Sequence, residues 1–166
     1  MVKISLCMIV KNEDTKLEIC LNGISNFADE IIIVDTGSED RTKEIALKYT
    51  NKIYDYKWSN NFSDARNFSL NKASNDCILV LDADEVVENI DIDKMKELFQ
   101  KNPMKVGRLN RINLYSREGV PFKYSERVNR FFSKRYFRYE GMIHEQVVSN
   151  VEQNYDTYSI PLVIKH

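Results

Sequence analysis

Ile78-Leu79-Val80-Leu81-Asp82-Ala83-Asp84-Glu85-Val86-Val87 begins as an apolar run that stops abruptly at three acidic residues. The unbroken apolar segment from Cys77 to Leu81 has the length of a strand that is covered on both faces, as in the parallel sheets of α/β proteins. We therefore predict a central strand over these residues. The acidic cluster then lies at the carboxyl end of that strand.

Asp82 and Asp84 are two residues apart. If the extended geometry continues past Leu81, their side chains point the same way, with Cα atoms about 7 Å apart. Ligands of open α/β sheets bind in the crevice beyond the carboxyl ends of the strands. Mg²⁺ and Mn²⁺ prefer hard oxygen ligands and commonly bind a few protein carboxylates and the phosphates of a substrate at the same time. The position favours a metal and diphosphate site over the alternative, a solvated turn before the next element.

The length predicts one domain over residues 1–166, because 166 residues can bury a hydrophobic core that needs no disulfide bonds for stability. The 24 basic and 25 acidic residues nearly balance, so the chain has no overall positive charge that would attract nucleic acid or an anionic membrane. Cys7, Cys20 and Cys77 are odd in number and lack zinc-site spacing, so we expect buried thiols in a reducing compartment. No stretch reaches the roughly 18 apolar residues of a membrane span. We expect a cytoplasmic protein, with peripheral membrane contact left open.

Strands and helices alternate along the first part of the chain. Residues 4–10 and 31–34 form apolar runs of strand length, and residues 17–24 carry an amphipathic helical stripe. Ser38 or Asp40 can begin the next helix. Short crossovers of this kind predict a parallel sheet whose following loops share one edge. The polar segment 11–13, Asp35 and Asp82 should therefore converge.

Weaker signals complete this part of the chain. They are a strand over residues 53–58, a helix over residues 62–73, and a helix that Asp91 caps and that ends near Pro103. Arg66 lies on the second of these elements. It could contact a nucleotide base or phosphate, and the equal alternative is an exposed helix arginine.

The second half, residues 104–166, reads as mixed sheet. Residues 106–115, 127–132, 146–151 and 160–165 are strand-like, and arginines alternate with aromatic residues. A mixture of arginines and aromatic residues can indicate RNA binding. However, the sequence has no RNP-like motif of aromatic residues on which bases could stack, and its charge is balanced, so we expect no nucleic-acid partner. Sugar or phosphate contacts explain the same residues. The last apolar segment has nothing after it to close the domain, so this half could be truncated at its C-terminus.

Several separated segments together match one pattern. They are residues 5–13 (SLCMIVKNE), 29–42 (DEIIIVDTGSEDRT), 61–67 (NFSDARN) and 81–85 (LDADE), followed by 130–132 (RFF) and 141–145 (GMIHE). The chain resembles glycosyltransferase family 2, and the last two segments resemble the subgroup similar to lipopolysaccharide β-1,4-glucosyltransferases. The resemblance spans residues 4–145. It implies the α/β GT-A fold, a Rossmann-like, mostly parallel central sheet flanked by helices, with a nucleotide-sugar half (1–103) and a mixed-sheet acceptor half (104–166).

The resemblance also implies roles for individual residues. Asp35 would hydrogen-bond the base, Arg66 would contact base or phosphate, and Asp82 and Asp84 would form the metal motif, with Asp82 near the ribose. The remaining positions that it assigns are Val10, Asn12 and Glu13 beside the nucleoside, Ala83 within the metal motif, and His166 as a further metal ligand. Mg²⁺ or Mn²⁺ would be the cofactor.

The expected reaction is a metal-dependent, inverting transfer of a sugar from a UDP-sugar, in preference to a GDP- or dTDP-sugar, to a glycan, lipid-linked or protein acceptor, as in cell-envelope polysaccharide synthesis. A metal would neutralise the charge on the leaving diphosphate. A carboxylate base must take the acceptor proton, and Glu145 is our candidate; the alternative is that it begins a surface strand.

Two other functions compete with this one. The chain could be a non-catalytic or truncated nucleotide-sugar-binding module, which would bind without turnover. Residues 82–86 also fit the nucleophile motif of haloacid-dehalogenase-like phosphatases. That family carries the motif on its first strand, whereas two strand–helix units precede it here.

Overall fold

The computed structural model describes residues 1–151 and 154–166 of the chain. The helices are α1 (Leu17–Ile24), α2 (Thr42–Ala46), α3 (Phe62–Lys72) and α4 (Ile92–Lys101). The strands are β1 (Ile4–Val10), β2 (Glu30–Asp35), β3 (Ile53–Asp55), β4 (Cys77–Val80), β5 (Val86–Ile90), β6 (Val106–Arg117), β7 (Val120–Ser133), β8 (Phe137–Glu140), β9 (Gln146–Ser149) and β10 (Thr157–Lys165). Among the helices of the described ranges, none is both long and apolar enough to cross a membrane.

Eight strands form the central sheet in the order β3-β2-β1-β4-β7-β6-β10-β5. The first four are parallel, as the alternation of strands and helices predicts. The second half is mixed, because β7 is antiparallel to β4 and β6, β10 is parallel to β6, and β5 is antiparallel to β10. Strands β8 and β9 form a separate pair. The α/β fold with a mixed second half is thus confirmed.

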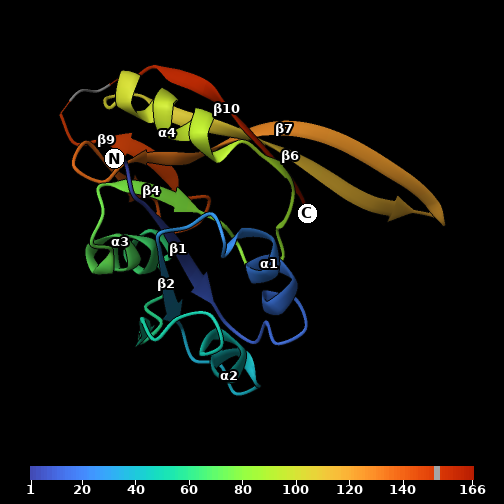
Figure 1. Ribbon diagram of the computed structural model, residues 1–166. Coiled ribbons are helices and arrows are strands. Elements are labelled where there is room, and N and C mark those ends of the chain that lie inside the picture. Colours follow the sequence, from blue (N-terminus) through green and yellow to red (C-terminus); the bar gives the residue numbers. More distant parts are fainter. Residues whose placement is uncertain (152–153) are drawn as a thin grey trace.

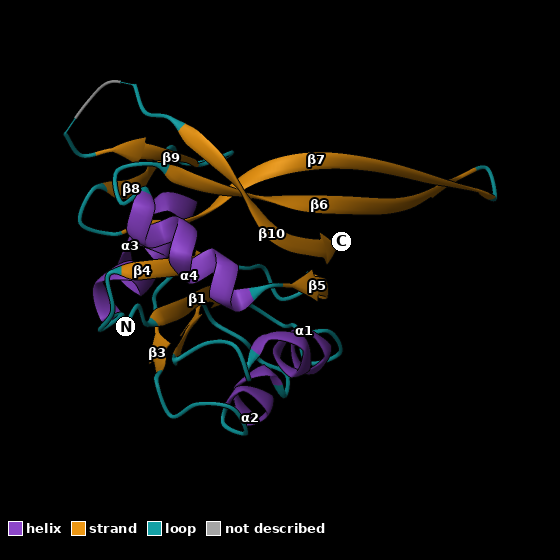
Figure 2. Cartoon of the chain, turned by 45° about the horizontal axis from the view of Figure 1, so that its top comes forward, coloured by secondary structure: helices purple, strands orange, loops and turns teal. Residues whose placement is uncertain are grey.

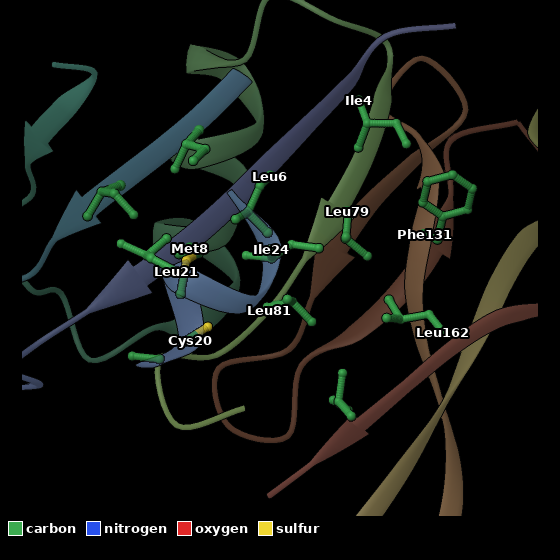
Figure 3. Close-up of a cluster of buried hydrophobic side chains, with 14 of the residues drawn as sticks. Ile4, Leu6, Met8, Cys20, Leu21, Ile24, Leu79, Leu81, Phe131 and Leu162 are labelled. Atoms are coloured by element: carbon green, nitrogen blue, oxygen red, sulfur yellow. The ribbon is translucent and has the colours of Figure 1, made fainter. Parts of the chain in front are cut away.

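The sheet separates two apolar clusters. Because side chains alternate along a strand, β1 sends Leu6 and Met8 into one cluster and Cys7 into the other. Helices α1, α2 and α4 cover the first cluster, and Leu79 and Leu162 also belong to it (Figure 3). Helix α3 and the β8–β9 pair cover the opposite face. The predicted central strand is therefore buried on both sides.

The three cysteines are buried free thiols, as expected. Burial raises the pKa of Cys7 and of Cys20 to about 12. Because the thiolate is the reactive form, these residues act as small apolar side chains.

The longest departure from the sequence-based expectation is the β6–β7 hairpin. Its two strands run continuously to a turn at Gly119 and project well beyond the body of the molecule (Figures 1 and 2). Near the tip, Tyr115 and Phe122 stack with ring centroids 5.4 Å apart. The tip side chains are exposed, although Val120, Phe122 and Tyr124 alternate with more polar neighbours as in a half-buried strand.

The expected extension of the acidic strand past Leu81 is wrong. Strand β4 ends at Val80, and residues 82–85 form a turn in which the Glu85 N–H donates to the Asp82 carbonyl (3.1 Å). The Glu85 side chain in turn accepts from the Asp82 N–H (2.9 Å). This reciprocal pair closes the turn and leads the chain into β5, which the sequence did not predict. Asp82 and Asp84 consequently have different partners.

Candidate functional site

The loops after β1 and β2 are fastened together at the carboxyl edge of the sheet. Val10 lies opposite Asp35 in the parallel register. The Asn12 N–H donates to Ser38 Oγ (2.9 Å), and Asn12 Oδ1 accepts from the Glu39 N–H (2.8 Å). Asn12 has a φ of +53°, a left-handed conformation that asparagine tolerates better than most residues. Its place in the structure is therefore that of a clamp between two loops.

A cavity of about 360 Å³ opens at this edge. The residues that the sequence predicted for the site and that line it are Val10, Glu13, Arg66, Asp82, Ala83, Asp84 and Glu145. Asn12, Asp35 and His166 lie outside its lining. Trp58 and Phe62 form an apolar wall, with ring centroids 4.8 Å apart. Sequence reasoning missed this wall, although a single tryptophan in a polar loop was a usable signal.

Asp35 is buried at the end of β2, with 1% of its surface exposed. Its Oδ1 accepts from the N–H groups of Gly37 and Ser38, both at 2.9 Å. Its Oδ2 is buried and has no hydrogen-bond partner among the described residues. A buried acceptor without a partner costs free energy, so this oxygen is suited to a donor that a ligand brings.

Asp82 is held between two buried arginines. Its Oδ1 accepts from Arg66 Nη2 (2.8 Å) and its Oδ2 from Arg130 Nη2 (2.6 Å). Burial alone would raise the pKa of the Asp82 carboxyl, but the two positive charges outweigh burial and hold the pKa well below its usual range. Arg66 is only 6% exposed, so the alternative of an exposed helix arginine is wrong.

Glu85 lies behind this group and is fully buried. Its Oε1 is 3.3 Å from Arg111 Nη1 and 3.5 Å from Arg130 Nη2. Burial raises the pKa of the Glu85 carboxyl, against the lowering effect of Arg130. Sequence reasoning gave the arginines of the second half only general sugar or phosphate contacts and gave Glu85 no role, because the ion pairs join residues far apart in the chain.

A β-bulge places Arg130 in this group. The register of β6 and β7 passes from Gly107–Phe131 to Arg108–Asn129, which leaves Arg130 without an opposite residue. Bulges re-aim side chains next to functional sites. Here the bulge turns Arg130 toward the end of β4.

Asp84 faces different neighbours. Its Oδ2 is 3.4 Å from His166 Nε2 and 3.6 Å from Lys16 Nζ. His166 Nδ1 lies 3.0 Å from Asn113 Oδ1, which fixes the imidazole ring. Within residues 1–151 and 154–166, no group of three or more His, Cys, Asp or Glu residues has the geometry of a metal site. A carboxylate oxygen beside an imidazole nitrogen nevertheless fits a Mg²⁺ or Mn²⁺ ion that takes its other ligands from phosphates and water.

Glu145 reaches the same cavity from the loop before β9. His144 has a φ of +58°, so the loop turns sharply just before Glu145. The Glu145 side chain is 15% exposed, and its Oε1 accepts from Arg66 Nε at 2.6 Å. The side chain thus lines the cavity, and the residue directly precedes β9, as the alternative of a strand start also expected.

Comparison with known proteins agrees with this geometry. Over 85 residues the chain is 47% identical to a TPR repeat-containing protein of Synechococcus elongatus, a match that covers 51% of this chain and 21% of that protein. Over 165 residues it is 26% identical to an uncharacterized glycosyltransferase of Rickettsia conorii, covering 92% of this chain and 57% of the relative. The chain therefore spans little more than half of the one relative and about a fifth of the other.

Two solved structures share the fold. S. aureus TarS 1-349 in complex with UDP gives a TM-score of 0.59 at 23% identity, covering 73% of this chain and 38% of that one. Glucosyl-3-phosphoglycerate synthase from Mycobacterium tuberculosis, in complex with Mn²⁺ and UDP-glucose, gives 0.54 at 20% identity, covering 66% and 44%. The family model described as Glycosyl transferase family 2 matches residues 5–154. The chain belongs to glycosyl transferase family 2.

Proposed function

We propose that this domain is a metal-dependent, inverting glycosyltransferase that moves a sugar from a UDP-sugar to a glycan, lipid-linked or protein acceptor. The observation that carries the proposal is the cavity at the carboxyl edge of the sheet, whose lining includes Asp82, Asp84 and Glu145. Two solved structures of the same fold were obtained with UDP or with Mn²⁺ and UDP-glucose, which supports a UDP-sugar as donor.

The donor's base would lie near the ends of β1 and β2. Uracil offers a ring N–H, and the Asp35 Oδ2 atom is an acceptor without a partner in the described chain. The apolar wall of Trp58 and Phe62 suits the flat face of a base or the ribose. Membership of the family and these two features together favour a nucleotide over a free sugar phosphate.

The donor's diphosphate would lie over the acidic turn. Asp84 and His166 would hold Mg²⁺ or Mn²⁺, and the bound ion would neutralise charge on the diphosphate as it leaves. Asp82 has both oxygens engaged by arginines, so its part would be to keep Arg66 and Arg130 at the floor of the cavity. Arg66 Nη1 is buried without a partner and can donate to a phosphate oxygen.

Glu145 would act as the base. In an inverting displacement the acceptor hydroxyl oxygen forms a bond to the sugar carbon, the bond from that carbon to the diphosphate oxygen breaks, and the hydroxyl proton must leave. Glu145 would accept that proton. The hydrogen bond from Arg66 Nε holds the carboxylate in one orientation for this step.

Isothermal titration calorimetry tests the donor and metal roles together. The parent protein should bind UDP more tightly with Mg²⁺ or Mn²⁺ than with EDTA. In the presence of the metal, Asp84→Ala should bind UDP about tenfold or more weakly than the parent. Asp93→Ala, an exposed aspartate on α4, is the matched control and should bind like the parent. Equal UDP affinity with and without metal, together with an unchanged Asp84→Ala variant, would show that the metal role is wrong.

The two competing hypotheses fare differently. A haloacid-dehalogenase-like phosphatase is wrong, because the chain belongs to glycosyl transferase family 2. A binding module without turnover is distinguished by a screen of UDP-sugar hydrolysis across several sugars. Release of UDP from any of them supports an enzyme, and UDP binding without release supports the module.

A further inference from the structure

A second cavity, of about 500 Å³, adjoins the first, beyond Leu79 and Phe131, where the pairing of β4 with β7 ends. The two cavities share Arg66, Asp82 and Glu145, which we call the shared wall. Five arginines line the second cavity, against the three carboxylates of Asp82, Glu126 and Glu145. These arginines are Arg66, Arg108, Arg111, Arg127 and Arg130. The lining therefore carries an excess of positive charge, whereas the chain as a whole carries none.

Two of these arginines lack a carboxylate partner. Arg66, Arg111 and Arg130 each form an ion pair. For Arg108 and Arg127 no carboxylate of the described chain lies within ion-pair distance, and Arg108 Nη2 donates only to the Arg127 carbonyl (2.9 Å). Like charges gathered on one face of a strand pair without a counter-charge are unfavourable. An anion from outside the chain would relieve this.

The second cavity also collects buried polar atoms that have no partner. Six such side-chain atoms occur in residues 1–151 and 154–166, and four of them belong to residues that line this cavity. They are Arg66 Nη1, Arg108 Nε, Tyr139 Oη and Asn129 Oδ1. The first three are donors. Arg66 belongs to the shared wall and is assigned to the donor diphosphate, which leaves Arg108 Nε and the Tyr139 hydroxyl, whose residue is more than nine-tenths buried, for a ligand of the second cavity. Unsatisfied buried donors are costly, so their concentration here indicates a ligand that accepts hydrogen bonds.

We propose that the second cavity binds an anionic group of the acceptor, a phosphate or a carboxylate. The inference rests on the proposed function, because the first cavity is assigned to the donor. Guanidinium groups match the oxygens of either anion, and a phenol hydroxyl adds a further donor. An acceptor anchored there would lie against the shared wall, where Glu145 belongs to both cavities. The acceptor hydroxyl would thereby be brought to the base.

Two variants separate this site from the donor site. Tyr139→Phe removes a hydroxyl that has no partner in the described chain, so it should leave folding intact. Arg108→Gln removes one of the two unpaired positive charges. Titrations use glucose 6-phosphate and glucuronate as probes, each in the presence of saturating UDP and Mg²⁺. We expect at least one probe to bind the parent, about tenfold more weakly to Arg108→Gln and about fivefold more weakly to Tyr139→Phe.

Matched controls come from the exposed end of the β6–β7 hairpin. Tyr124→Phe and Arg117→Gln change the same residue types outside the cavity and should bind the probes like the parent. UDP affinity and thermal unfolding, measured on every variant, should stay at the parent values. The probe that binds better identifies the anion as phosphate or carboxylate.

Three results would overturn the inference: neither probe binds the parent, both variants bind the probes like the parent, or UDP displaces the probe. The last result would place the anion in the donor site. The same titrations without UDP keep the two proposals apart. If the parent binds a probe through Arg108 and Tyr139 but does not bind UDP, the donor assignment fails and the anion site stands.

Discussion

Asp82 and Asp84 are separated by one residue and yet serve different neighbours. Asp82 is neutralised by Arg66 and Arg130, which lie 16 and 48 positions away in the chain. Asp84 instead faces His166 and Lys16. The pair and its place at a strand end could be predicted from the sequence. The different partners of the two aspartates could not be predicted, because they depend on long-range contacts and on a turn that local spacing does not reveal.

Glu145→Gln tests the base at the scale of a single residue. The amide keeps the shape of the carboxylate but cannot accept a proton. Turnover should therefore fall about 10²-fold or more, while UDP affinity stays within a few-fold of the parent. Initial rates of UDP release and calorimetry measure the two quantities. Glu140→Gln, an exposed residue on β8, is the control. A Glu145→Gln variant that turns over within a few-fold of the parent would assign the residue to structure.

Arg130→Met tests the ion-pair group beneath the cavity. The change removes one positive charge from both Asp82 and the fully buried Glu85. Removing one member of a buried ion pair leaves an uncompensated charge, so we expect a loss of about 3 kcal/mol in the free energy of unfolding. Urea denaturation measures it, with Arg135→Met on an exposed loop as the control. An Arg130→Met variant as stable as the parent would mean that Arg111 alone balances Glu85.

At the scale of elements, the two ends of the parallel strands have different tasks. The carboxyl ends carry the cavity, and the amino ends are tied together by Glu30 at the start of β2. Glu30 is 8% exposed and accepts hydrogen bonds from Ser5 on β1, from Lys52 before β3 and from Ser74 after α3. One carboxylate thus joins the segments that hold the site at the other end of the sheet.

Glu30 should give the protein a specific acid sensitivity. Burial would raise the pKa of its carboxyl, but the hydrogen bonds from Lys52, Ser5 and Ser74 outweigh burial and lower the pKa to about 2, from an ordinary 4.5. This stabilisation is present above pH 4.5 and is lost as the pH falls toward 2. Glu30→Gln should cost up to about 3 kcal/mol at pH 7 and flatten the loss of stability in acid.

Urea denaturation at a series of pH values checks this prediction. Glu97→Gln is an informative control, because hydrogen bonds from Lys101 and Lys94 also lower the pKa of Glu97 to about 2, but this side chain on α4 is 42% exposed. Solvent screening makes such exposed pairs weak. The control should therefore unfold like the parent, and an equal effect in both variants would contradict a special role for Glu30.

Two elements that sequence reasoning missed share one property. Strand β5 (Val86–Ile90) has no fully buried residue, and the outer part of the β6–β7 hairpin is exposed on both faces. Sequence patterns report burial, so they find β1, β2 and β4, whose side chains are almost all buried. Exposed strands are fixed by their partners instead. Hence the half of the sheet that carries Asp35 and Asp82 was predictable, and the half that adds Arg111 and Arg130 was less so.

At the scale of the whole molecule, the two halves build one site. The shared wall takes Arg66 and Asp82 from residues 1–103 and Glu145 from residues 104–166. The main core is likewise joint, because Phe131 and Leu162 belong to the cluster of β1 and α1 (Figure 3). We therefore expect the described chain to unfold as one cooperative unit, in which the two halves of the sequence melt together.

Trp58 makes the last prediction measurable, because it is the single tryptophan of the chain and lines the cavity at the carboxyl edge of the sheet. Urea unfolding followed by Trp58 fluorescence reports the first half, and far-UV circular dichroism reports the strand-rich second half as well. The two curves should coincide, and UDP with Mg²⁺ should move both to higher urea by the same amount, since a ligand of the native state stabilises the whole cooperative unit. At a free ligand concentration of 100 times Kd the shift corresponds to about 2.7 kcal/mol. A fluorescence transition that precedes the dichroism transition would mean that residues 1–103 unfold separately, and the shared wall would then be an interface between two units. A shift confined to fluorescence would lead to the same conclusion, because donor binding would then stabilise only the half that carries Trp58.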